Sequence, residues 1–152
     1  MNSEFIQPFI EAAISAFEQS TQSKVNRGPI KLQQSPMPTR GVASFIGIMG
    51  KVEGRLLLDL SRDTACKLTA RLNGQESAEY DELVISTINE LANIIGGRAV
   101  SALVNKGYKL EITPPTLFSG NDMEVSNFTM ETVVIPIETE FGLVNVNLAL
   151  KV

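Results

Sequence analysis

The spacing of apolar residues predicts three amphipathic helices. In residues 3–20 the apolar side chains recur every three or four positions, which is typical of a helix with one buried face: Phe5, Ile6, Phe9, Ile10, Ala13 and Phe17. Pro8 lacks a backbone N–H, so this helix should start late or bend early. Ser61 is a suitable N-cap for a second helix that ends near residues 73–74. The third and longest periodic segment runs from about residue 80 to 106.

Strand-like runs occupy most of the remaining chain. Residues 42–49 and 55–60 are apolar runs joined by the glycine-flanked segment 50–54, which predicts a β-hairpin. Shorter strands are expected near 30–33 and 109–112, the second followed by a proline-containing loop.

Two further runs, 132–138 and 144–151, lie at the end of the chain. Pro136 cannot donate to a strand ladder, which favours an edge position or a bulge for the first run. In the second run, apolar residues alternate with polar or small ones, as in a strand with one wet face. Hairpin-type strands mixed with helices predict an α+β fold with a mostly antiparallel sheet, formed by residues 1–152 as a single domain.

The long helix has two distinct faces. Its apolar stripe is assigned to the core: Val84, Ile88, Leu91, Ile95 and Ala102. A second set, spaced by four, three and four residues, projects from the opposite side: Ser86, Glu90, Asn93 and Gly97. A carboxylate and a carboxamide thus project together, and Gly97 leaves room for the backbone of another molecule. From spacing alone, a solvated helix face with a glycine pair for close packing is the commoner interpretation.

Composition narrows the chemistry that the chain can perform. The 152 residues include no histidine, which excludes Ser-His and Cys-His nucleophile pairs and histidine-containing metal sites. The single cysteine, Cys66, permits no internal disulfide and fits a reducing compartment. In an amphipathic segment it is more typical of a small core residue than of a reactive thiol.

Charge and hydropathy point to a cytoplasmic protein. The net charge of −4 and the lack of a basic run argue against nucleic-acid binding. No apolar stretch approaches the roughly 20 residues of a membrane span, and the first residues do not have the pattern of a secretory signal.

The segment from Tyr80 to Asn93 resembles the signature of the CheC/CheX/FliY chemotaxis phosphatase family. That signature has Asp or Ser, then Glu four residues later, then Asn three residues after that. A proline follows a little over twenty residues later, and Pro114 and Pro115 occupy that place here. This combination is most similar to CheX-like members. CheC-type members carry a second site on a related helix, but residues 11–14 have isoleucine where the amide would lie, so one site per chain is expected.

The resemblance implies a phosphatase that acts on the aspartyl-phosphate of a response-regulator receiver domain. It implies that Asn93 positions a water in line with the phosphorus and that Glu90 engages the receiver's active-site lysine. Ser86 matches the first motif position and, with Gly97, is assigned a supporting or partner-contact role. The Mg²⁺ would belong to the phosphorylated receiver, and the chain would hold no metal or cofactor of its own.

Two alternatives use the same helix face without catalysis. One is a module that only binds a receiver domain, and the other is a dimerisation module. The resemblance also implies a homodimer, an expectation to which edge-like final strands would contribute.

Overall fold

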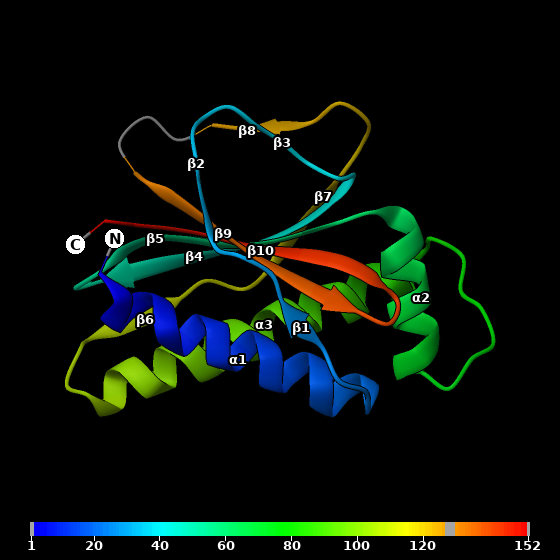
Figure 1. The fold of residues 1–152 in the computed structure, drawn as a ribbon, viewed down its shortest axis with the longest axis horizontal. Helices are drawn as coiled ribbons and strands as arrows, with labels where there is room; N and C mark the ends of the chain where they lie inside the picture. Colours follow the sequence, from blue (N-terminus) through cyan, green and yellow to red (C-terminus); the bar gives the residue numbers. More distant parts are fainter. Residues whose placement is uncertain (1, 127–129, 152) are drawn as a thin grey trace.

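The computed structural model describes residues 2–126 and 130–151, which fold into helices packed against a sheet. Figure 1 shows α1 and α3 side by side on one face of the sheet, with α2 at one end. The helices in the described residues are α1 (Ser3–Thr21), α2 (Arg62–Leu72) and α3 (Glu82–Asn105). In this part of the chain, no helix is long and apolar enough to cross a membrane.

Within the described residues the main sheet has eight strands, and every pairing in it is antiparallel. Its order is β1-β9-β10-β5-β4-β6, with β2 also pairing β9 and β7 also pairing β4. A separate two-stranded sheet, β3-β8, lies on the side away from α1 and α3 (Figure 1). The strands are β1 (Asn26–Arg27), β2 (Lys31–Gln33), β3 (Met37–Pro38), β4 (Val42–Gly50), β5 (Glu53–Leu60), β6 (Leu110–Ile112), β7 (Thr116–Ser119), β8 (Glu124–Val125), β9 (Thr132–Thr139) and β10 (Gly142–Lys151). The prediction of an α+β fold with a mostly antiparallel sheet is confirmed.

The helices follow the predicted bounds closely. The Ser61 side chain accepts a hydrogen bond from the Thr64 N–H at 3.1 Å, so Ser61 is the N-cap of α2 as predicted. Helix α1 begins at Ser3, where Asn2 caps it, and continues through Pro8. Of the two alternatives expected for Pro8, a late start or an early bend, the late start is therefore wrong. Pro8 is buried, so its ring contributes apolar surface to the core while the backbone loses one helical hydrogen bond.

The apolar stripe of α3 packs against the sheet and α1. Val84, Ile88, Leu91 and Ile95 are at most 1% exposed, as predicted, whereas Ala102 is only half-buried. Leu103 takes the core position at that end of the helix. Helix α3 contacts both a neighbouring helix and the sheet, so its buried side is wider than one stripe. For this reason the predicted stripe did not identify the last core residue of the helix.

The final strands are not at an edge of the sheet. Strand β9 has β10 on one side and both β1 and β2 on the other, and β10 lies between β9 and β5. The expected edge position of Pro136 is met only locally, because β1 pairs with residues after Pro136 and β2 with residues before it. The carbonyl of Pro136 accepts from the Gly28 N–H at 2.9 Å, so its missing N–H faces this gap, and the β10 ladder loses no bond.

The predicted wet face of the last strand is also wrong. Asn147 is only 4% exposed and Ala149 is fully buried. Met37 and Pro38 of β3 line a cavity with Asn147, so the segment that carries β2 and β3 folds over this face of the sheet. The sequence predicted the three-residue strands β2 and β6, but not β1, β3, β7 and β8. Segments of two to four residues carry little periodic signal, so such short strands are identified unevenly.

The two adjacent glycines of α3 have different environments. A Cβ on Gly96 would lie 3.3 Å from Ile46 Cδ1 and 3.6 Å from Leu56 Cδ2, so Gly96 brings the helix close to the sheet. A Cβ on Gly97 would meet no atom within 4 Å among the described residues. Gly96 thus serves packing, and Gly97 leaves the outer face of the helix open.

These environments predict opposite effects on stability. Gly97→Ala should raise the free energy of unfolding by about 0.8–1 kcal/mol, because alanine restricts the unfolded chain and fits the open space. Gly96→Leu should lower it by about 1–3 kcal/mol, because the added atoms push against the sheet. Urea denaturation followed by circular dichroism measures both, and equal shifts in the two variants would contradict the assignment of Gly96 to packing.

Candidate active site

The polar face of α3 is held in place by the start of its helix and by its core. The Asp81 side chain caps the helix by accepting hydrogen bonds from the N–H groups of Leu83 at 3.1 Å and Val84 at 3.4 Å. This cap adds negative charge at the positive end of the helix dipole. With the apolar stripe buried on the sheet, the side chains on the opposite face must project outward.

The structure brings the four predicted residues together on one outer face. Ser86, Glu90 and Asn93 are exposed, and Gly97 is half-buried beside them. Within the part of the chain that the structure describes, neither Glu90 nor Asn93 has a hydrogen-bond or ion-pair partner. The carboxylate and the carboxamide are one helical turn apart and are both available to another molecule.

Ser86 is engaged locally. Its hydroxyl donates to the Leu83 carbonyl at 3.1 Å, a bond within the helix. This contact occupies the hydroxyl proton with a backbone carbonyl, and among the described residues no base accepts it, which does not fit an activated nucleophile. Ser86 is better suited to a surface contact next to Glu90.

A part-buried hydrogen bond next to Glu90 was not predicted from the sequence. The Ser44 hydroxyl donates to Asn89 Oδ1 at 2.7 Å. Ser44 belongs to β4 and is fully buried, whereas Asn89 is half-buried. The bond limits rotation of α3 on the sheet and so orients Glu90, the next residue. A serine in an apolar strand and an asparagine beside the motif were the only signals in the sequence.

The loop with Pro114 and Pro115 connects β6 to β7 and is anchored to β4. The Thr113 N–H donates to the Gly47 carbonyl at 2.9 Å, and the Gly47 N–H donates to Thr113 Oγ1 at 2.8 Å. Pro114 is exposed and Pro115 is half-buried. The prolines thus lie in a fixed connection at the sheet edge.

The first helix does not repeat the polar pair. Glu11 is exposed and accepts a hydrogen bond from Gln7 Nε2 at 3.3 Å. Ile14, at the position of the amide, is half-buried and packs against the core. An isoleucine cannot hold a water, so one site per chain stays the expectation. Arg98 donates to Ser15 Oγ at 3.2 Å and ties α3 to α1.

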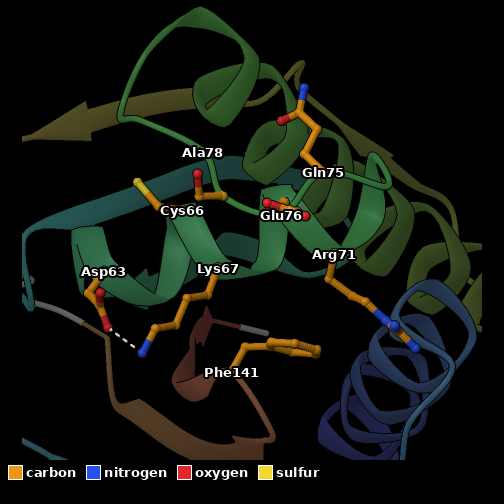
Figure 2. A pocket seen from close by; sticks show the side chains of 10 residues that line it. Asp63, Cys66, Lys67, Arg71, Gln75, Glu76, Ala78 and Phe141 are labelled. Carbon is orange, nitrogen blue, oxygen red and sulfur yellow. Dashed lines mark ion pairs between the residues drawn. The ribbon is translucent and has the colours of Figure 1, made fainter.

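Cys66 lies in a different place, at a pocket of about 480 Å³ beside α2 (Figure 2). It is half-buried, and Figure 2 shows it with Lys67, which forms an ion pair with Asp63 at 3.0 Å. Burial, together with the charges of Asp63 and Asp81, raises the pKa of the Cys66 thiol. A raised pKa keeps the thiol protonated, so Cys66 lacks the character of a nucleophile.

A groove adjoins the polar face of α3. It has a volume of about 400 Å³ and lies where the C-terminal ends of α1 and α2 meet the N-terminal half of α3. Ser86 and Glu90 belong both to this groove and to the polar face. Among the described residues, no group of three or more His, Cys, Asp and Glu side chains could hold a metal ion.

Helices on an antiparallel sheet, with an exposed Glu-x-x-Asn pair on the central helix, define a protein of the CheC/CheX class. Residues 42–138 match the family model described as chemotaxis phosphatase CheX. The chain belongs to this family.

A curated relative supports the same grouping. The chain is 39% identical over 88 residues to the CheY-P phosphatase CheX of Thermotoga maritima, a match that spans 57% of each chain. The chain therefore covers little more than half the length of this relative.

Solved structures extend the similarity to nearly the whole chain. The CheX-CheY-BeF3-Mg²⁺ complex of Borrelia burgdorferi matches with a TM-score of 0.86 at 30% identity and covers 97% of this chain and 98% of the other. A CheC-like protein from Shewanella sp. PV-4 has a TM-score of 0.90 at 21% identity with full coverage of both chains, which shows the shared fold.

The part-buried hydrogen bond between Ser44 and Asn89 should contribute measurably to stability. Ser44→Ala should lower the free energy of unfolding by about 1–2 kcal/mol, because Asn89 Oδ1 loses its donor in a partly desolvated position. Ser86→Ala is the matched control, and its effect should stay within about 0.5 kcal/mol, because that exposed hydroxyl is replaced by water. Chemical denaturation of both variants gives the comparison, and equal losses would contradict the anchoring role.

Proposed function

We propose that this protein is a phosphatase that hydrolyses the aspartyl-phosphate of a CheY-type response-regulator receiver domain. The observation that carries the proposal is the exposed pair Glu90 and Asn93, one turn apart on the outer face of α3 and without partners among the described residues. Two relatives support it: one carries the name CheY-P phosphatase, and another was solved in complex with CheY, BeF3 and Mg²⁺.

The chemistry needs little from the phosphatase itself. An aspartyl-phosphate is a reactive acyl phosphate, so a water placed in line with phosphorus is sufficient to displace the carboxylate. The new P–O bond forms to the water, the bond to the aspartyl oxygen breaks, and inorganic phosphate leaves. Hydrolysis therefore requires neither an activated nucleophile nor a metal from this chain, in agreement with a sequence that has no histidine.

Asn93 is the residue proposed to position the water. Its carboxamide offers both a hydrogen-bond acceptor and donors, so it can orient a water without placing a negative charge near the phosphoryl oxygens. Its place on a rigid helix, rather than on a loop, limits the motion that would misalign the attack.

Glu90 is proposed to hold the receiver's active-site lysine by a charge-assisted hydrogen bond. This contact would form before the chemical step and fix the position of Asn93 over the phosphoryl group. Gly97 lies further along the same face, where the open surface would allow the receiver backbone to approach, and Ser86 would contribute a contact on the other side.

The remaining features of the proposal follow from the substrate. The Mg²⁺ ion would be bound by the phosphorylated receiver rather than by this chain. Residues 1–152 would act as one domain with one site, in the cytoplasm, where receiver domains are phosphorylated. The alternative function is that of a module that binds the receiver without hydrolysing its phosphate.

Substitution of the two residues should separate catalysis from binding. Asn93→Ala should lower the rate constant for hydrolysis by about 10²–10³, because one preorganised polar group is lost at the transition state, while affinity changes little. Glu90→Gln should weaken both the affinity and the rate, since its contact forms before chemistry. The assay uses a receiver loaded with acetyl phosphate in the presence of Mg²⁺, with the variants compared at several receiver concentrations.

Two controls match these variants. Asn105→Ala, at the exposed end of α3, and Glu111→Gln, at the exposed residue of β6, should behave as the unmodified protein. An Asn93→Ala variant that hydrolyses at the normal rate would disprove the catalytic assignment. Binding of the receiver without any acceleration of phosphate loss by the unmodified protein would establish the binding module instead.

The homodimer remains a proposal, but one argument for it is lost, because β9 and β10 are internal and not edge strands. It rests on the single site per chain and on similarity to CheX proteins. Light scattering at micromolar concentration should give twice the chain mass of 16.5 kDa. A measured mass close to one chain would contradict the dimer and leave the proposed phosphatase activity unaffected.

A further inference from the structure

The groove beside Glu90 combines an apolar interior with one acidic group. Its apolar lining comes from Leu72 of α2 and from Leu83, Leu91 and Ile94 of α3. Besides Glu90, its polar lining consists of neutral side chains: Ser20, Asn73, Ser86 and Thr87. Of the described residues that line it, Glu90 alone is charged. The groove therefore matches a surface on which an apolar side chain lies next to a cation.

Leu83 is the most exposed of the apolar residues that line this groove. Its side chain is 37% exposed although it lies in the first turn of α3, one turn before Ser86 and two before Glu90. An isolated exposed leucine on a protein surface needs no explanation. This one borders a groove of about 400 Å³ that shares Ser86 and Glu90 with the polar face.

We infer that this groove receives a bulky apolar side chain of the receiver domain, next to the lysine that Glu90 engages. The inference rests on the proposed function and adds a second anchor to it. A receiver that brings its lysine to Glu90 must place the neighbouring part of its surface over the groove, since Glu90 belongs to both. At interfaces, most of the binding energy comes from a few residues that fill well-packed, desolvated pockets.

The apolar anchor would also strengthen the polar contact. A side chain that fills the groove removes water from one side of the Glu90 carboxylate, and the attraction between opposite charges rises as the local dielectric constant falls. The size and shape of the groove would then discriminate between receivers that carry the same active-site residues but different neighbouring side chains.

The test is a pair of substitutions at Leu83 with a control on the same helix. Leu83→Ala should raise the KM for the phosphorylated receiver about tenfold while kcat stays within about twofold, because the anchor acts in binding and not in the chemical step. Leu83→Met should restore a KM close to that of the unmodified protein, since methionine keeps the apolar volume. Val104→Ala, which truncates a 45% exposed apolar residue at the far end of α3, should change neither parameter.

The outcomes separate this inference from the proposed function. An unchanged KM in Leu83→Ala, or an equal rise in Val104→Ala, would overturn the groove as an anchor while hydrolysis by the unmodified protein still supports the phosphatase. If the unmodified protein does not accelerate hydrolysis, the proposed phosphatase activity is disproved. The role of the groove is then tested by the affinity for a receiver loaded with BeF3 and Mg²⁺. A tenfold lower affinity of Leu83→Ala would support the groove as an anchor, and an unchanged affinity would overturn it. A change in the molecular mass of Leu83→Ala measured without receiver would show that a second copy occupies the groove, which also overturns the inference.

Discussion

The close packing of α3 on the sheet is the constraint on which the rest of the structure depends. Gly96 lets the helix approach Ile46 and Leu56, and the apolar stripe on either side of it is buried almost completely. Once that face is buried, the rotation of the helix is set, and Glu90 and Asn93 can only project into solvent. The site is thus a consequence of the core: a helix that must bury one side presents the other side rigidly.

A polar contact refines the orientation that the core imposes. Apolar packing tolerates small rotations, whereas a hydrogen bond from the fully buried Ser44 to Asn89 depends on distance and direction. Asn89 directly precedes Glu90, so the bond fixes the orientation of the helix next to the acidic side chain. The helix thus carries an anchoring polar residue on its sheet side and the exposed polar pair on its solvent side.

The proposed division of labour between two proteins explains why the site is so small. A receiver domain that carries the reactive acyl phosphate and its metal leaves the hydrolase with alignment as its remaining task. Alignment requires fixed positions more than reactive groups, and a helix provides these better than a loop. The groove that Leu83 lines would extend the contact with the receiver beyond these two side chains, as a specific and transient complex requires.

The sequence by itself determined the helices, the central hairpin, the α+β class and the outer face of α3. Each of these depends on residues close together in the chain, whose periodicity follows directly from backbone geometry. It did not determine that β9 and β10 are internal, that Pro136 faces a gap between β1 and β2, or that Asn147 is covered. Nor did it reveal the contact of Ser44 with Asn89 or the groove that three helices form beside Glu90. Only the tertiary structure decided these features, because each depends on which distant segments lie next to one another. Local periodicity reflects only residues close together in the chain and does not specify such contacts.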